Sequence, residues 1–214
     1  MKNNSILILL MLVLLTGSAL AVEFSGDVTG VSTYVWRGVK QFDGVAMQGT
    51  AGLTSGPVTV GFWSSTMHGP MEVETDPFVQ VSLPAGEIST AVGATLYSYD
   101  FFAKSEYNVY EVYGALAYGA AGVTFFYTPE QENMDESVYW LEVSGGSTLL
   151  GADVGATLGY GTYSSSTDDA VTTLTLSAGK SVSDNVAVSW NYSIGVSDDD
   201  NLENIFFMTA GYSF

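Results

Sequence analysis

The sequence predicts an all-β fold, an antiparallel up-and-down transmembrane β-barrel of about twelve strands that is preceded by a cleaved signal peptide. Apolar residues recur at every second position from Phe24 to Phe214. The runs that they form carry almost no charge on either face. The chain is also 47% hydrophobic and only 13% charged, with a mean hydropathy of +0.24. Such a chain is too apolar for a disordered protein, and something other than water should face much of its surface.

Charge and cysteine content exclude several functions. The chain has 5 Lys+Arg against 23 Asp+Glu, a net charge of −18, and no cysteine. Disulfide, zinc-thiolate and thiol chemistry are therefore excluded. Nucleic-acid affinity depends on Lys and Arg, so we expect no nucleic-acid partner. We also expect no cofactor.

The first 21 residues have the features of an export signal. Lys2 provides a positive start, residues 6–15 are an unbroken apolar run, and residues 18–21 form a small-x-small cleavage pattern that ends at Ala21. The alternative is a membrane anchor, but the run is shorter than the roughly 18 to 20 residues that a spanning helix needs. We expect residues 1–21 to be a signal peptide and residues 22–214 to form one barrel domain.

Residues after the signal follow a period of two, which is the spacing of a strand with two unlike faces. Val188, Trp190 and Tyr192 share one face of such a run, and Ser189 and Asn191 share the other. A soluble sandwich or barrel also alternates, but its exterior would carry charge. Here the polar face is mostly Ser, Thr and Gly. We expect the apolar face to contact lipid and the small polar face to enclose water.

Counting these runs gives about twelve strands. The roughly 190 residues after Ala21 leave about 16 for each strand and its connection, which suits membrane strands of about 9 to 11 residues. The predicted strands lie near residues 24–36, 44–54, 57–66, 76–83, 87–99, 108–119, 122–129, 137–146, 152–163, 170–180, 186–197 and 204–214.

The predicted connections alternate in length and chemistry. Those after even-numbered strands are short and turn-like, as at residues 55–57 and 183–185. Those after odd-numbered strands are mostly longer and hold most of the acids, as at residues 198–203. One mouth of the barrel should therefore be strongly negative and attract cations over anions.

Aromatic residues mark the strand ends and the carboxy terminus. Trp36 and Trp190 lie on the predicted apolar face and suit the interfacial girdles of a membrane barrel. Tyr212 and Phe214 end an alternating last strand, which looks like the insertion signal read by the barrel-insertion machinery of Gram-negative bacteria. The alternative is an ordinary final strand. The expected location is the bacterial outer membrane, with its lipid and lipopolysaccharide as partners.

Several segments resemble one family. The segment at residues 31–39 (VSTYVWRGV) is similar to the S-x-Y-x-x-R-G segment of the TorF-like porins, long catalogued as the Gcw conserved hypothetical family. Residues 61–65 (GFWSS) and 108–113 (NVYEVY) resemble later blocks of that family in the same order. The resemblance implies an outer-membrane barrel with a transport role, but no established substrate and no catalytic residues. The family often has Asp where this chain has Thr33, so an Asp–Arg partnership at that spot is absent here.

Five residues are candidates for a lumenal constriction. Lipid-facing Arg near the bilayer midplane costs about 2 to 4 kcal/mol, so Arg37 should face the lumen or the rim. Glu111 and Glu142 share faces with Tyr113 and Trp140 and should point inward. One hypothesis is that Arg37, Glu111 and Glu142 meet as a charged filter, and the other is an ion-pair network that braces a narrow interior. The remaining candidates could stack on a solute or fill space. They are Trp63 and Trp140.

No residues are predicted to be catalytic, and metal binding is weakly indicated. The one histidine, His68, lies in a predicted loop tip, so we do not expect an enzyme. A loop near the carboxy terminus carries carboxylates without the spacing of a calcium-binding loop. They could hold a divalent cation or contact cations that bridge lipopolysaccharide. These candidates are Asp198, Asp199, Asp200 and Glu203.

Together these features predict a narrow passive channel for small neutral or cationic solutes. The small lumenal residues leave space, and twelve strands lie between packed eight-stranded barrels and open sixteen-stranded porins. The alternative is a non-conducting structural or adhesive barrel whose acidic loops engage lipopolysaccharide through divalent cations. A lumen stoppered by the constriction candidates would favour this alternative.

Overall fold

The computed structural model describes residues 21–67, 73–102, 107–132, 134, 136–162, 170–197 and 202–214. The predicted signal peptide (except Ala21), His68 and Asp198 to Asp200 lie outside this part of the chain. No helix among the described residues is long and apolar enough to cross a bilayer.

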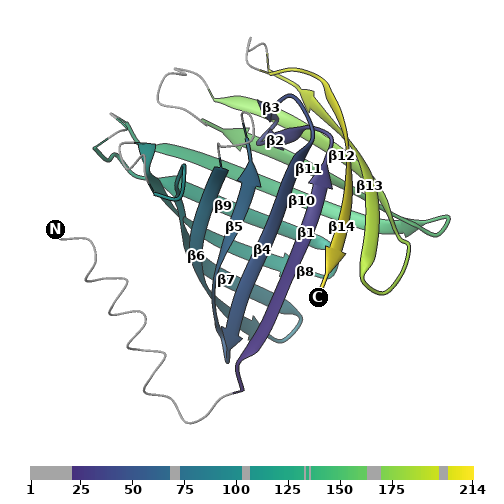
Figure 1. Cartoon of the computed structure of the whole chain (residues 1–214), viewed down its shortest axis with the longest axis horizontal. Coiled ribbons are helices and arrows are strands. Elements are labelled where there is room, and N and C mark those ends of the chain that lie inside the picture. Colours follow the sequence, from purple (N-terminus) through teal and green to yellow (C-terminus); the bar gives the residue numbers. More distant parts are fainter. Residues whose placement is uncertain are drawn as a thin grey trace.

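The protein is a closed antiparallel barrel of twelve strands, which confirms the predicted fold class and strand number (Figure 1). Each strand pairs with its neighbours along the chain, and β1 pairs with both β4 and β14. The barrel strands are β1 (Glu23–Val31), β4 (Ala46–Ser55), β5 (Val58–Thr66), β6 (Val73–Ala85), β7 (Ile88–Tyr97), β8 (Val109–Tyr118), β9 (Ala121–Thr128), β10 (Val138–Leu149), β11 (Ala152–Gly161), β12 (Val171–Ser181), β13 (Val186–Gly195) and β14 (Ile205–Ser213).

Hydrogen bonds between the first and last strands complete the ring. Gly26 N donates to Phe214 O at 3.0 Å, and Phe214 N donates to Gly26 O at 2.9 Å. Phe214 also fills the space beside Gly26, where an added Cβ would approach its ring. Closure matters because lipid offers no hydrogen bonds to an open sheet edge.

The two faces of the strands divide as their alternation predicts. Val112, Leu116, Trp190 and Phe206 are exposed on the outside of the ring. On the inside, Ser193 is completely buried. The outer surface is therefore a continuous apolar layer, of the kind that suits a hydrocarbon environment rather than water.

A row of exposed tyrosines runs around the outside near the ends of the strands from β8 to β13. Its members are Tyr110, Tyr127, Tyr139, Tyr160 and Tyr192. The strand ends that carry this row adjoin the longer connections, and we call this the long-loop end of the barrel. The opposite end has tight connections, such as residues 86–87 and 119–120, and we call it the short-turn end. The row matches the aromatic girdle expected at a membrane interface.

The first predicted strand, residues 24–36, is wrong in its second half. β1 ends at Val31, and the following residues form a separate two-stranded hairpin of β2 (Tyr34–Trp36) and β3 (Val39–Phe42). Arg37 and Gly38 both have positive φ, 50° and 83°, which is the geometry of the tight turns that favour hairpins. Tyr34 and Trp36 keep the alternation of β1, so the period alone does not reveal the turn.

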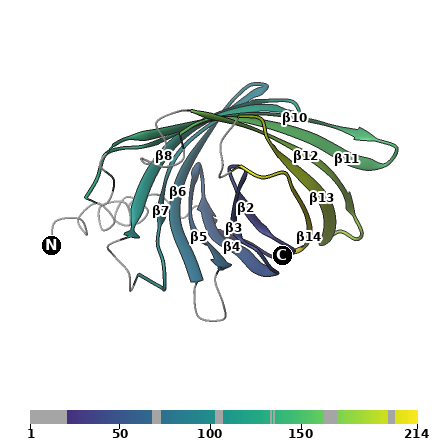
Figure 2. The same ribbon diagram turned by 90° about the horizontal axis from the view of Figure 1, so that it is seen from above.

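This hairpin lies inside the ring, at the long-loop end (Figure 2). Val31, Tyr34 and Ala46 form a buried apolar cluster there, and Trp36, Phe42, Trp63 and Met67 pack against it. Trp36 is therefore not a lipid anchor, contrary to the sequence-based expectation, whereas Trp190 does lie on the outer face. The interior packing of the barrel is concentrated where the hairpin enters it.

Candidate lumenal site

The β2–β3 hairpin carries Arg37 across the lumen. Arg37 stands at the tip, and its guanidinium reaches Glu111 on β8. In the ring, β8 is separated from β1 by four strands on one side and by six on the other, so this contact joins nearly opposite walls. Gly38 meets a third part of the wall, because a side chain at this position would overlap Thr173 on β12.

Arg37 and Glu111 form a buried ion pair. Arg37 Nη2 lies 2.8 Å from Glu111 Oε1 and 2.9 Å from Oε2. The two side chains are only 4% and 3% exposed. Tyr97 Oη donates to Glu111 Oε1 at 2.8 Å, and Thr128 Oγ1 donates to Oε2 at 3.0 Å. Both carboxylate oxygens are thus satisfied, which offsets the cost of removing the charges from water.

Three aromatic rings surround the guanidinium. Arg37 Cζ lies 4.3 Å from the ring centroid of Trp36, 4.7 Å from that of Phe126 and 5.7 Å from that of Trp140. Cation–π contacts of this kind contribute about 2 kcal/mol when they are desolvated. Arg37 is therefore bound by both charge and aromatic surface.

Trp140 is held in place by its neighbours on β10 and β11. Its side chain is buried, and its indole Nε1 donates to Glu142 Oε1 at 3.0 Å. Gly159 on β11 leaves room for the ring, because a Cβ there would overlap Trp140. One hypothesis from the sequence is that Glu142 meets Arg37 and Glu111. In the structure Glu142 instead accepts a hydrogen bond from Trp140, whose ring faces Arg37.

A second polar cluster lies near the base of the hairpin. Tyr34 Oη donates to Glu74 Oε2 at 3.0 Å, and the Tyr34 ring lies 5.5 Å from that of Trp63. Burial, and then the neighbouring Glu74 carboxylate, raise the pKa of Tyr34, so its hydroxyl remains a donor. Asp76, two residues along the same strand face, accepts from Ser98 N at 3.1 Å. Trp63 therefore packs against the hairpin at the long-loop end.

The predicted strand near residues 76–83 leaves Glu74 in the preceding connection and has Asp76 as its first residue, and this start is wrong. Both lie in β6, which begins at Val73, and both are buried. The signal was present, because Glu74, Asp76 and Gln80 share a parity.

An ion pair joins strand β3 of the hairpin to the connection between β13 and β14. Lys40 Nζ lies 3.0 Å from Glu203 Oε2 and 3.4 Å from Asp43 Oδ2. Hydrogen bonding to Glu203 raises the pKa of Lys40. Glu203, a metal-ligand candidate, thus pairs with a cation. In the described ranges, no group of three or more His, Cys, Asp or Glu side chains could hold a metal ion.

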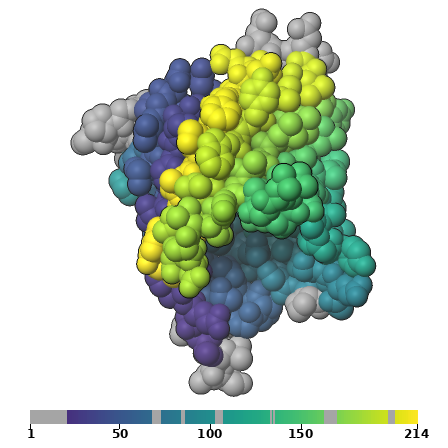
Figure 3. All heavy atoms as spheres, turned by 90° about the vertical axis from the view of Figure 1, so that its right-hand side faces the viewer, coloured from purple at the N-terminus to yellow at the C-terminus, as the bar shows by residue number. Residues whose placement is uncertain are grey.

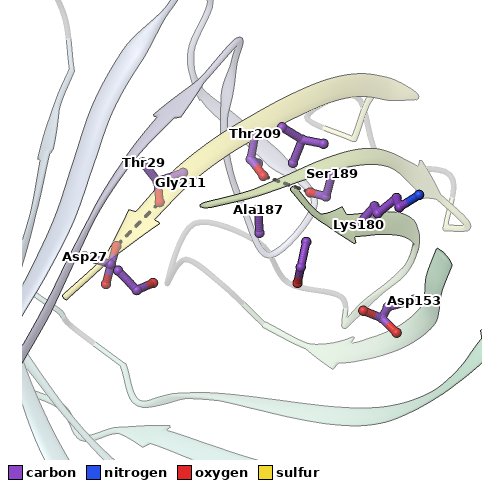
Figure 4. Close-up of a pocket in the computed structure, with 12 residues that line it drawn as sticks. Asp27, Thr29, Asp153, Lys180, Ala187, Ser189, Thr209 and Gly211 are labelled. Atoms are coloured by element: carbon purple, nitrogen blue, oxygen red, sulfur yellow. Dashed lines mark hydrogen bonds between the residues drawn. The ribbon is translucent and has the colours of Figure 1, made fainter. Parts of the chain in front are cut away.

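The short-turn end of the lumen holds a cavity of about 360 Å³. Figure 3, which looks toward the green turn between β10 and β11, shows the surface hollowed beneath it. Hydroxyl groups, two carboxylates and Lys180 line the cavity (Figure 4), and Ser189 Oγ lies 2.8 Å from Thr209 Oγ1. The carboxylates belong to Asp27 on β1 and Asp153 on β11. This polar space suits water and small hydrophilic solutes.

The two residues of the predicted insertion signal lie on the outside of the last strand. Tyr212 and Phe214 are exposed, and their ring centroids are 6.2 Å apart. Phe214 also lies 5.9 Å from Phe24 on β1. These rings form a small aromatic cluster over the seam at the short-turn end.

Solved structures share this fold, which is that of outer-membrane β-barrels. The chain is similar to the KdgM porin, with a TM-score of 0.61 and 16% identity over 89% of this chain and 99% of that one. Omp33 of Acinetobacter baumannii has a TM-score of 0.55 and 8% identity over 92% and 100% of the two chains. Outer membrane phospholipase A from Escherichia coli has a TM-score of 0.50 and 11% identity over 91% of each. At these identities the likeness concerns the fold alone.

No protein-family model matches the chain, and no curated protein matches it by sequence. The narrower assignment to the TorF-like porins therefore rests on the motifs quoted above.

Proposed function

We propose that this protein is an outer-membrane channel, exported by a cleaved signal peptide, that passes small neutral or cationic solutes. One observation carries the proposal: a closed barrel with a polar lumen is narrowed by an inward-folded hairpin that ends in a buried Arg37–Glu111 pair. A hairpin of this kind restricts the bore while the barrel provides the passage. The fold shared with porins supports this assignment.

The lumenal charges favour cations. Six carboxylates and two cations, Arg37 and Lys180, line the lumenal sites described above. The carboxylates belong to Asp27, Glu74, Asp76, Glu111, Glu142 and Asp153. An acidic lumen raises the local concentration of cations and repels anions. One KdgM structure is a complex with oligogalacturonate, a polyanion that this lumen would disfavour.

Planar-bilayer recording of the refolded protein tests the proposal. Under a potassium chloride gradient, we expect step-like conductance and a reversal potential that favours potassium. A panel of neutral, cationic and anionic solutes as blockers would then rank the preferred class. A reversal potential that favours chloride would contradict the cation preference, and absence of any conductance would contradict the channel.

One feature favours the alternative, a non-conducting structural or adhesive barrel. The hairpin inserts Arg37 into the long-loop end and packs against the barrel residues Trp63, Glu111 and Trp140, which is the arrangement expected of a stoppered lumen. In that case the acidic loops would engage lipopolysaccharide through divalent cations. A silent wild type together with calcium-dependent binding to lipopolysaccharide would support this alternative.

The same proposal predicts which lipids and proteins the barrel contacts in the cell. We expect Tyr212 and Phe214 to be read by the barrel-insertion machinery and the apolar exterior to contact outer-membrane lipid. The fold shared with a phospholipase does not by itself argue for an enzyme, because one fold hosts many functions. A lipid-hydrolysis assay that compares the wild type with His68→Ala tests for such an activity, and only turnover that the variant loses would support an enzyme.

A further inference from the structure

The Arg37 side chain occupies a pocket whose walls belong to the barrel. Tyr97 lies on β7, Glu111 on β8, Phe126 on β9 and Trp140 on β10, and we call these four residues the cation cage. Phe126 and Trp140 are direct register partners, and all four strands are adjacent in the ring. The cage therefore does not depend on the hairpin for its shape. Only the occupant, Arg37, and the Trp36 ring come from β2 and its turn.

The cage has the chemistry that recognises organic cations. Aromatic faces with a carboxylate attract guanidinium and quaternary ammonium groups. A guanidinium is weakly hydrated, so it enters such a site at less cost than a compact, strongly hydrated ion. Glu111 supplies the negative charge, and Tyr97 and Thr128 hold its oxygens in position through hydrogen bonds of 2.8 and 3.0 Å. A solute that offers the same cation could make the contacts that Arg37 makes.

The occupant is held in a way that permits exchange. β2 and β3 have three and four residues and form a sheet only with each other, so side-chain contacts rather than the barrel sheet hold the Arg37 tip in place. Arg37 also has a left-handed backbone with φ of 50°, which is unfavourable for a non-glycine residue. Its side-chain contacts offset that strain, so a competing cation would remove much of what keeps the tip docked.

We propose that the cation cage is a binding site for small organic cations of the guanidinium or alkylammonium type, and that Arg37 is its tethered occupant, which such a solute displaces. The inference deepens the proposed function. It rests on that function for one point, that the solute reaches the cage through the lumen. A tethered group competes at an effective concentration in the millimolar range. The wild type should therefore bind free cations much more weakly than a variant without Arg37.

The test is equilibrium binding to the full-length barrel in detergent, with folding checked by the heat-dependent gel mobility of the barrel. Tryptophan fluorescence reports the cage, because Trp140 lies in it. Guanidinium and tetramethylammonium chlorides are titrated at millimolar concentrations, with sodium chloride at equal ionic strength as reference. We expect Arg37→Ala to bind guanidinium saturably and at least about tenfold more tightly than the wild type. Arg37→Ala with Glu111→Gln should lose this binding.

Two further variants keep the test decisive. Lys180→Ala removes one cation from the short-turn end of β12 and should bind like the wild type. Equal tightening in Lys180→Ala and Arg37→Ala would overturn the site, as would no saturable response in Arg37→Ala. If Arg37→Ala does not fold, Arg37→Gln replaces it, because it also removes the tethered cation, and binding no tighter than wild type would overturn the site.

The same samples in planar bilayers separate this site from the channel. Saturable binding without conductance would retain the cage and overturn the proposed channel. Cation-selective conductance without saturable binding would retain the channel and overturn the cage.

Discussion

At the residue scale, the Glu111 carboxylate is the centre of the lumenal network. It receives hydrogen bonds from Arg37, Tyr97 and Thr128, which come from three different elements. Removing one member of a buried pair leaves the other charge without compensation, and this typically costs about 3 to 5 kcal/mol. The residue is therefore expected to affect both stability and permeation.

Glu111→Gln tests whether the Arg37–Glu111 pair filters ions or only stabilises the barrel. We expect a lower free energy of unfolding in urea, by about 3 kcal/mol, because Arg37 would remain buried without a counter-charge. If the pair also filters ions, single-channel conductance and the reversal potential should change. Glu142→Gln is the matched control, since it makes the same substitution on a neighbouring lumenal strand and keeps the Arg37–Glu111 pair. Unchanged conductance and selectivity in Glu111→Gln would leave only the bracing role.

A second residue-scale prediction concerns Gly159. Gly159→Ala should destabilise the barrel by about 1 to 3 kcal/mol, because the new methyl group would overlap the Trp140 ring. Gly145→Ala is the control on β10, where an added Cβ meets nothing within 4 Å. Urea unfolding followed by tryptophan fluorescence measures both variants. Equal stability of the two would contradict the close packing of Trp140.

At the element scale, the β2–β3 hairpin decides the bore. Replacing residues 34–42 by a short Gly-Ser linker leaves all the ladder pairs of the barrel in place. We expect a correctly folded barrel with a several-fold larger single-channel conductance, because conductance grows with the open cross-section. A variant that folds and conducts like the wild type would show that the hairpin does not limit the bore.

The same hairpin marks the boundary of what the sequence could predict. The strands β4 to β14 follow from period two, because each has one lipid face and one lumenal face. β2 shares that alternation, so only the left-handed turn at Arg37 and Gly38 distinguishes it from the end of a longer β1. Parity placed Arg37 and Glu111 in the lumen, but their contact spans 74 sequence positions and depends on the hairpin folding inward. The inward folding of the hairpin depends on tertiary contacts, which periodicity does not encode.

At the scale of the whole molecule, the net charge of −18 should govern ion selectivity. The screening length falls from about 10 Å at 0.1 M salt to about 3 Å at 1 M. If selectivity comes from the acidic lumen and loops, the cation-to-anion permeability ratio should fall as potassium chloride rises across this range. Reversal potentials at fixed concentration ratio measure it. A ratio independent of salt would place selectivity in short-range contacts alone.

The seam where Gly26 and Phe214 exchange hydrogen bonds places the first and last strands of the barrel side by side. A few added residues could connect the two ends, and the ring could then be cut at a tight connection such as residues 119–120. Such a permuted barrel would retain every strand pair while moving the last-strand aromatic residues to the middle of the chain. It would distinguish the features that the barrel requires to fold from those that the cell requires to recognise and insert it.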